Sequence, residues 1–152
     1  MTGTAAQYDG TTYVIPCGGA KVNTPAPARD LYAGQMFAHT LAAAEKAAAW
    51  DRSQGIPARV LILSALHGLV ELDTVLAPYD VKMGDPQSVT PAVLAAQATA
   101  LGLGWGSEVY AFLPAAYFTA LDTALRTLDV YPAPVYEAAP GIGYQRAVNC
   151  HA

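Results

Sequence analysis

The chain is poor in charge and in the residues that bind nucleic acid or metal. Of its 152 residues only 13% are charged, with eight Lys and Arg against twelve Asp and Glu, a net charge of −4. Because DNA binding depends on several Lys and Arg contacts to phosphates, this balance argues against a protein that coats DNA. The three histidines are scattered, Cys17 and Cys150 lie near opposite ends, and there is no C-x-x-C pair. The sequence therefore predicts no metal site and gives little support for a disulfide.

Long apolar runs are missing as well. No hydrophobic stretch approaches the roughly 18 residues that a membrane-spanning helix needs. The first twelve residues, MTGTAAQYDGTT, lack the basic and apolar regions of a signal peptide. We therefore expect a cytoplasmic protein that does not enter a membrane. The 53% hydrophobic content predicts one compact domain over residues 12–152, after a flexible lead-in over residues 1–11.

Strand-like and helix-like segments alternate along the chain. Four segments read as strands, at 13–16, 59–64, 108–113 and 130–136, and the second is apolar almost throughout, as in a strand covered on both faces. Helical patterns lie between them, at 31–51, from Thr90-Pro91 onward and after Pro114, whereas 64–85 reads as a long irregular loop. This βαβαβαβ order predicts an α/β protein, a three-layer α/β/α sandwich with a mostly parallel sheet of four or five strands. Two prolines place the fourth strand at an edge.

Ligands of such sheets bind beyond the carboxyl ends of the strands. Four loops qualify: PCGGAK (16–21), SALHG (64–68), LPAAY (113–117) and APGIGYQ (139–145). Three of the four are rich in glycine or polar residues. In the fourth, Gly141 and Gly143 are candidate ligand contacts, although GIG is too short for a dinucleotide-binding motif.

The first loop concentrates the reactive side chains. Lys21 is a candidate nucleophile, proton carrier or phosphate-binding cation, with a solvated surface lysine as the alternative. Cys17 is a second candidate nucleophile, or else a small buried hydrophobe at a strand end. Gly18 and Gly19 let the backbone approach a ligand or adopt a positive φ. The loop is not a Walker motif, because G-x-x-x-x-G-K-[ST] is absent.

Arg29, Asp30 and Tyr32 lie just before or at the start of the first predicted helix. Asp30 is expected to cap that helix. We expect Arg29 to contact a phosphate or carboxylate, or to pair with Asp30 or Asp80, and Tyr32 to lie near the mouth of the site.

Further candidates follow the second strand. Ser64 and His67 come at its end, and Tyr79 and Asp80 come later in the long loop. A histidine in this place is a candidate general acid or base, with a structural hydrogen bond as the alternative. Asp80 would orient His67 or bind a sugar hydroxyl. No G-x-S-x-G elbow is present, so a hydrolase triad is not predicted.

The segment ILSALHGLVELDTVLAPYDVKMGD (62–85) resembles the signature of the YaaA-type peroxide-stress proteins. It is still closer to a bacterial and phage domain family of unassigned function that has S-A-x-H-G-L and P-Y-D. That family's C-x-x-x-K, P-A-R-x-L-Y-x-G-x-x-F and G-I-G-x-Q elements correspond to CGGAK, PARDLYAGQMF and GIGYQ here. The resemblance covers about three quarters of the chain. YaaA-type proteins are linked to DNA binding and oxidative stress.

The P-C-x-x-x-K element is also similar to one in archaeosine synthases, which modify a 7-deazaguanine base in transfer RNA. In those enzymes the lysine of the motif engages the nitrile of the base. The resemblance implies that Lys21 is the reactive residue here and Cys17 its neighbour.

These observations favour an enzyme that acts on a nucleobase or nucleotide without a cofactor. The chemistry would be base modification, of the 7-deazaguanine kind, or N-glycosyl transfer or hydrolysis, so the enzyme would be a transferase, lyase or glycosidase. The site would combine Lys21, His67, Cys17 and Asp80. One alternative is a non-catalytic DNA- or nucleotide-binding module of the YaaA type, and another is a structural protein whose motifs only build tight loops. The substrate and the oligomeric state stay open.

Overall fold

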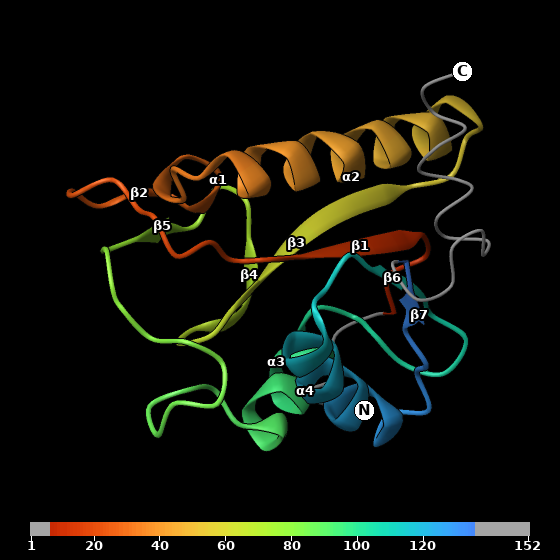
Figure 1. The fold of residues 1–152 in the computed structure, drawn as a ribbon. Coiled ribbons are helices and arrows are strands. Elements are labelled where there is room, and N and C mark those ends of the chain that lie inside the picture. Colours follow the sequence, from red (N-terminus) through yellow and green to blue (C-terminus); the bar gives the residue numbers. More distant parts are fainter. Residues whose placement is uncertain (1–6, 136–152) are drawn as a thin grey trace.

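The structure is a computed structural model that describes residues 7–135, and it contains a five-stranded sheet with helices on both faces (Figure 1). The strand order is β4-β3-β1-β6-β7, with all neighbours parallel except β4 and β3. The strands are β1 (Thr11–Pro16), β3 (Ala58–Ser64), β4 (Gly68–Glu71), β6 (Glu108–Ala111) and β7 (Ala133–Pro134). The predicted three-layer, mostly parallel sandwich is confirmed, and β7 is indeed an edge strand.

The central strand β1 divides the core into two halves. Tyr13 and Ile15 point into a cluster with the alanines of α2 (Gln35–Ser53), whereas Val14 points into a cluster with α3 (Pro91–Ala100) and α4 (Ala115–Arg126). All three side chains are fully buried. This alternation follows from the two-residue period of a strand, and the small side chains of α2 let that helix pack closely on the sheet. Figure 1 shows α2 on one face and α3 and α4 on the other.

Two predicted helix starts are confirmed and one is wrong. Thr90 caps α3 by accepting a hydrogen bond from the Val93 N–H at 3.3 Å, with Pro91 in the first turn, and Pro114 immediately precedes α4. Asp30, however, does not cap the long helix. It lies inside the separate short helix α1 (Ala28–Leu31), and α2 begins only after Gly34.

The break between α1 and α2 has a visible cause. The backbone around Tyr32 is bound to the loop after β1, because Val22 N donates to Leu31 O at 2.9 Å and Ala33 N donates to Ala20 O at 2.8 Å. A β-bridge joins Lys21 and Tyr32. These bonds hold the backbone around Tyr32 extended, so a continuous helix from residue 31 cannot form.

The segment 64–85 contains strands where a loop was expected. β4 turns back along β3, and the short β2 (Ala26–Pro27) pairs with β5 (Val75–Leu76) in a second, antiparallel sheet. The glycine loop 139–145 lies outside the described residues. None of the helices within 7–135 is both long enough and apolar enough to span a membrane.

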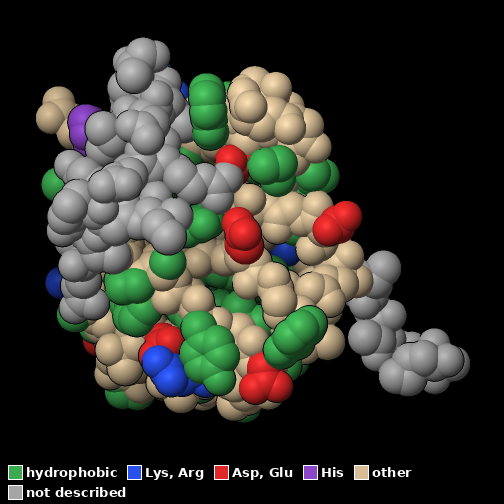
Figure 2. Space-filling view, turned by 90° about the vertical axis from the view of Figure 1, so that its right-hand side faces the viewer, with side chains coloured by type: hydrophobic (Ala, Val, Ile, Leu, Met, Phe, Trp, Pro, Cys, Tyr) green, Lys and Arg blue, Asp and Glu red, His purple; other side chains and the backbone are tan. Residues whose placement is uncertain are grey.

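Figure 2 shows the end of the molecule at which β1 and β3 begin. Hydrophobic and acidic side chains are spread over the part of this face that is described, with only small areas of Lys and Arg. Two of the chemistry-bearing loops that the sequence predicts, 16–21 and 64–68, lie toward the other end, where β1 and β3 finish (Figure 1).

Candidate functional site

The strand order has a topological switch point at the carboxyl end of β1. The chain leaves β1 toward α2 on one face, and it leaves the neighbouring β6 toward α4 on the other. Ligands of open α/β sheets bind where such connections diverge. Cys17 directly follows β1, Tyr117 lies in the first turn of α4, and the Cys17 Sγ is 3.4 Å from the Tyr117 hydroxyl. The sequence had indicated Cys17 as a candidate nucleophile, but Tyr117 only as the last residue of the LPAAY loop.

Tyr79 is the centre of the site. Its hydroxyl lies 2.6 Å from the Tyr32 hydroxyl and 2.6 Å from Ser64 Oγ. The Lys21 Nζ lies 4.4 Å from the centroid of the Tyr79 ring, and the His67 ring packs edge-on against Tyr79 with 5.2 Å between centroids. Three separate segments of chain therefore meet on one aromatic side chain.

We call this group the Tyr79 cluster. Its members share a position beyond the carboxyl ends of β1, β3 and β6: Cys17, Lys21, Tyr32, Ser64, His67, Tyr79 and Tyr117. Ser64 and Tyr32 are buried, and the other five are half-buried.

The hydroxyl groups of Ser64, Tyr79 and Tyr32 have one more proton than the hydrogen bonds between them use. Ser64 Oγ accepts the N–H of Leu66 at 3.2 Å and of His67 at 3.0 Å, which fills its two lone pairs, so its own O–H is donated to Tyr79. A single proton then fills the bond between Tyr79 and Tyr32. The second phenolic proton of this pair has no acceptor among the three hydroxyls, and it is a donor that a ligand can use.

The tyrosines of the cluster are neutral at neutral pH. Burial raises the pKa of the Tyr79 and Tyr32 hydroxyls above the ordinary 10.0. Burial also raises the pKa of Tyr117, with a further contribution from the Cys17 side chain to which it hydrogen-bonds. Each of these groups therefore keeps its proton and can donate it in a hydrogen bond.

The Lys21 ammonium faces neutral groups. It donates to Gly19 O at 3.2 Å and lies over the rings of Tyr79 and Tyr32, at 4.4 and 5.8 Å from their centroids. Within residues 7–135 no carboxylate pairs with it. Its charge is thus positioned by ring faces and one carbonyl oxygen, and no carboxylate of the described residues neutralises it.

Gly18 and Gly19 do not need a positive φ, so only the predicted role in backbone approach is left for them. A Cβ added at Gly19 would meet nothing within 4 Å, whereas one at Gly18 would contact Phe37 and Tyr32. There is therefore open space beside the Lys21 loop.

The turn that carries His67 is locked by a residue that sequence analysis missed. The Gln97 side chain, from α3, accepts the Leu69 N–H at 2.9 Å and donates to His67 O at 2.8 Å. Gly68 has φ +80°, and a Cβ there would collide with the Gln97 carboxamide. The glycine of the SALHG loop is thus required by geometry rather than by a ligand.

Asp80 is not where the predicted mechanism needs it. Its side chain is exposed and makes no hydrogen bond or ion pair with any other residue in the described part of the chain. The His67 ring packs on Tyr79 instead. The prediction that Asp80 orients His67 is therefore wrong for this structure, and a role toward a sugar hydroxyl is what stays open.

Arg29 lies at a different site. Its Nη1 is 3.3 Å from Glu45 and its Nε is 3.4 Å from Asp73, so the predicted pairing with Asp30 or Asp80 is wrong. The α1 helix and the turn after β4 bring these partners together, and neither contact is visible from sequence spacing. Arg29 lines a cavity at the side of the sheet, and no residue of the Tyr79 cluster lines that cavity.

Three residues named in the sequence analysis lie outside the described structure. Gly141, Gly143 and Cys150 lie outside residues 7–135. Cys17 is a free thiol. Among the residues that the structure describes, no three His, Cys, Asp or Glu side chains are grouped closely enough to hold a metal ion.

Comparison with known families places the chain. A family of unknown function (DUF6884) matches residues 12–145, which include every residue of the Tyr79 cluster. The chain belongs to this family. No curated protein and no solved structure matches it. For this DUF6884 member, the resemblances to YaaA-type proteins and archaeosine synthases therefore enter only as support for a proposal.

Proposed function

We propose that this DUF6884 protein is an enzyme that acts on a nucleobase or nucleotide at the Tyr79 cluster. The observation that carries the proposal is the meeting of the Lys21 ammonium, the His67 imidazole and a surplus phenolic donor on one aromatic ring. A planar base can stack on an aromatic side chain and can be read by hydrogen bonds to its edge. The surplus phenolic proton suits a carbonyl oxygen or ring nitrogen of such a base.

The residues would divide the chemistry as follows. Lys21 would act as the nucleophile after losing a proton, or would bind a phosphate as the ammonium. His67 would transfer the proton as general acid or base. Cys17, with the Tyr117 hydroxyl 3.4 Å from its sulfur, is the second nucleophile. Asp80, which is exposed and follows Tyr79 in the chain, would bind a sugar hydroxyl.

The resemblance of PCGGAK to the archaeosine synthase element supports the finer proposal. It favours modification of a 7-deazaguanine base, with Lys21 engaging the nitrile. N-glycosyl transfer or hydrolysis at a base is the related reaction that the same residues would support. Mass spectrometry of products distinguishes the two, because only the second reaction separates base from sugar.

The test is turnover by the intact protein with 7-deazaguanine derivatives, nucleosides, nucleotides, transfer RNA and DNA. Lys21→Ala and His67→Ala should each lower the rate by about 100-fold or more, the usual size of a lost nucleophile or general acid–base group. Lys82→Ala is the matched control, because Lys82 is an exposed loop lysine outside the cluster. Unchanged turnover in both Lys21→Ala and His67→Ala would sink the proposal.

One observation favours a second function, a non-catalytic nucleotide- or DNA-binding module of the YaaA type. Within residues 7–135 no carboxylate orients His67, since Asp80 makes no contact with it. This function predicts saturable nucleotide binding, or a salt-dependent gel shift of DNA, without any product. Lys21→Ala would then weaken binding, and no substrate in the panel would be turned over.

A further inference from the structure

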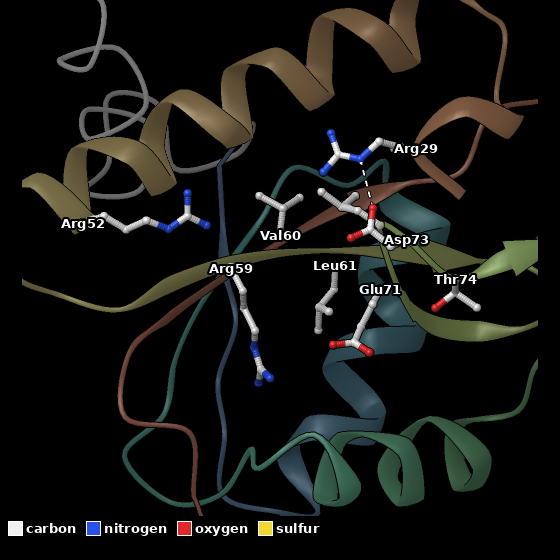
Figure 3. Close-up of a pocket in the computed structure, with 9 residues that line it drawn as sticks. Arg29, Arg52, Arg59, Val60, Leu61, Glu71, Asp73 and Thr74 are labelled. Carbon is white, nitrogen blue, oxygen red and sulfur yellow. Dashed lines mark hydrogen bonds and ion pairs between the residues drawn. The ribbon is translucent and has the colours of Figure 1, made fainter. Parts of the chain in front are cut away.

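A cavity of about 420 Å³ opens at the side edge of the sheet, apart from the Tyr79 cluster (Figure 3). Three of the chain's five arginines line it, Arg29, Arg52 and Arg59, together with the acids Glu71 and Asp73. We call it the arginine notch. Its volume lies within the range of small-molecule sites. Such a concentration of guanidinium groups is unexpected in a chain with a net charge of −4.

The notch exists because β3 is longer than its edge partner. The last pair between β3 and β4 is Leu61 with Glu71, so Ala58–Val60 have no strand from residues 7–135 beside them on that side. After Glu71 the chain turns away, with Thr74 N donating to Glu71 O at 3.1 Å. The open edge of β3 forms the floor of the notch.

Arg52 is fixed at this edge by a neutral oxygen. Its Nε and Nη2 both donate to Ala58 O, at 3.1 and 2.7 Å. Within residues 7–135 no carboxylate lies within 4 Å of it. The guanidinium is therefore held in one orientation while its charge and its Nη1 donors are available, which is the arrangement that favours a bound anion.

Arg29 stands across Val60 from Arg52, and Figure 3 shows both guanidinium groups on the same side of β3. Its ion pairs are long, at 3.3 Å to Glu45 and 3.4 Å to Asp73, and the Asp73 side chain is 88% exposed. Exposed pairs of this kind hold little free energy, so an incoming anion can compete for Arg29.

Arg59 extends to the other side of β3 in Figure 3. It is held by Thr12 Oγ1 at 3.0 Å and Leu101 O at 2.7 Å, again neutral oxygens. Burial lowers the pKa of Arg59, and Tyr8 and Glu71 only partly oppose this effect. The notch thus carries a second guanidinium whose charge is incompletely balanced.

We propose that the arginine notch binds a small molecule through a carboxylate or phosphate group held between Arg52 and Arg29. Both arginines present the planar fork that matches these groups. Glu71 and Asp73 flank the notch and would repel a long polyanion, so a small ligand fits better than a nucleic acid strand. This site is independent of the proposed enzyme activity, and none of its lining residues belongs to the Tyr79 cluster.

The test is titration of the intact protein with inorganic phosphate and, separately, citrate, followed by calorimetry and by amide NMR at constant ionic strength. We expect saturable binding with shifts at Val60 and Thr74. Arg52→Gln and Arg29→Gln should each weaken binding about tenfold or more, the effect of a lost charge-assisted hydrogen bond. Preference for phosphate or for citrate identifies which anionic group the notch prefers.

Arg126→Gln is the matched control, because it removes an equal charge from an exposed ion pair with Asp122, and it should leave binding unchanged. Lys21→Ala should also bind normally, which separates the notch from the Tyr79 cluster. If Arg52→Gln unfolds because Ala58 O loses its donors, Arg29→Gln decides alone. The proposal is wrong if the wild-type protein shows no saturable binding, or if Arg126→Gln weakens binding as much as Arg29→Gln. In either case Arg52 serves only to cap an exposed strand edge.

Discussion

The Tyr79 cluster and the arginine notch are polar for different physical reasons. In the cluster, Tyr79, Tyr32 and Ser64 are connected by hydrogen bonds of 2.6 Å, and burial keeps the phenols neutral. In the notch, the Arg52 guanidinium is held by the carbonyl oxygen of Ala58. The strand ends thus carry neutral phenolic donors beside one ammonium, Lys21, whereas three guanidinium groups line the side edge of the same sheet. The first arrangement suits a planar polar ligand, and the second suits an anion.

The largest expected effect on stability is that of a substitution at Gly68, which should disturb the Tyr79 cluster and leave the arginine notch unchanged. Gly68→Ala forces a side chain into a left-handed backbone and against Gln97, which then loses its hydrogen bonds to His67 O and Leu69 N. We expect a loss of about 2–4 kcal/mol in the free energy of unfolding. Urea denaturation measures this, and anion binding by the folded fraction should be unchanged.

Gly55→Ala is a close control for this change. Gly55 has φ +79°, almost the same as Gly68, but a Cβ there would meet nothing within 4 Å. It should show only the backbone strain of about 1–2 kcal/mol. Equal losses in Gly55→Ala and Gly68→Ala would mean that the Gln97 lock contributes nothing to stability.

The next effect tests the shared protons of the cluster. Tyr79→Phe removes the hydroxyl that accepts the Ser64 O–H, and Ser64 is fully buried. An unsatisfied buried donor should cost about 1–3 kcal/mol of unfolding free energy. Tyr131→Phe is the control, because the Tyr131 side chain is exposed and its change should be near zero. A Tyr79→Phe protein as stable as wild type would show that the hydroxyl chain is not a structural unit.

The pH dependence of the unfolding free energy tests the buried phenols of the cluster. Tyr32, Tyr79 and Tyr117 have pKa values raised above 10.0 by burial, so the folded state keeps protons that the unfolded state releases above about pH 10. Their contribution to stability is therefore complete below pH 10 and falls as the pH rises further. Urea titrations between pH 8 and 11 should show this fall, and it should be smaller in Tyr79→Phe. An identical pH profile in the variant would contradict the assignment.

Much of the fold was predictable because it depends on long, uniform patterns. The apolar run of β3, the Thr90-Pro91 helix start and the alternation of segments each indicate local structure, and the parallel sheet follows from their order. β4 was not predictable, because four residues are too few to show a period, and its pairing depends on the turn that Gln97 holds. The start of α2 was misjudged because tertiary bonds to Tyr32's neighbours override helix propensity.

The candidate site was predictable only as far as the loops that form it. Residues after strand ends were expected to meet, and Lys21, Ser64 and His67 do lie around Tyr79. Side-chain contacts between residues that come from different strands of the sheet were not predictable. Tyr117 reaches Cys17 from 100 residues away, and nothing in the sequence marks that contact beyond the position of Tyr117 at the end of a loop after β6.

The smallest expected effect sharpens the account of the notch. Asp73→Asn removes one carboxylate from Arg29, and because the Asp73 side chain is 88% exposed, the unfolding free energy should change by less than about 0.5 kcal/mol. The freed guanidinium and the lower negative charge should instead strengthen phosphate binding by roughly two- to fivefold, within the energy of an exposed ion pair. Asp122→Asn, which frees Arg126 outside the notch, should leave phosphate binding unchanged. Weaker binding in Asp73→Asn would mean that Asp73 holds Arg29 in its binding position, and equal strengthening in both variants would reduce the effect to net charge alone.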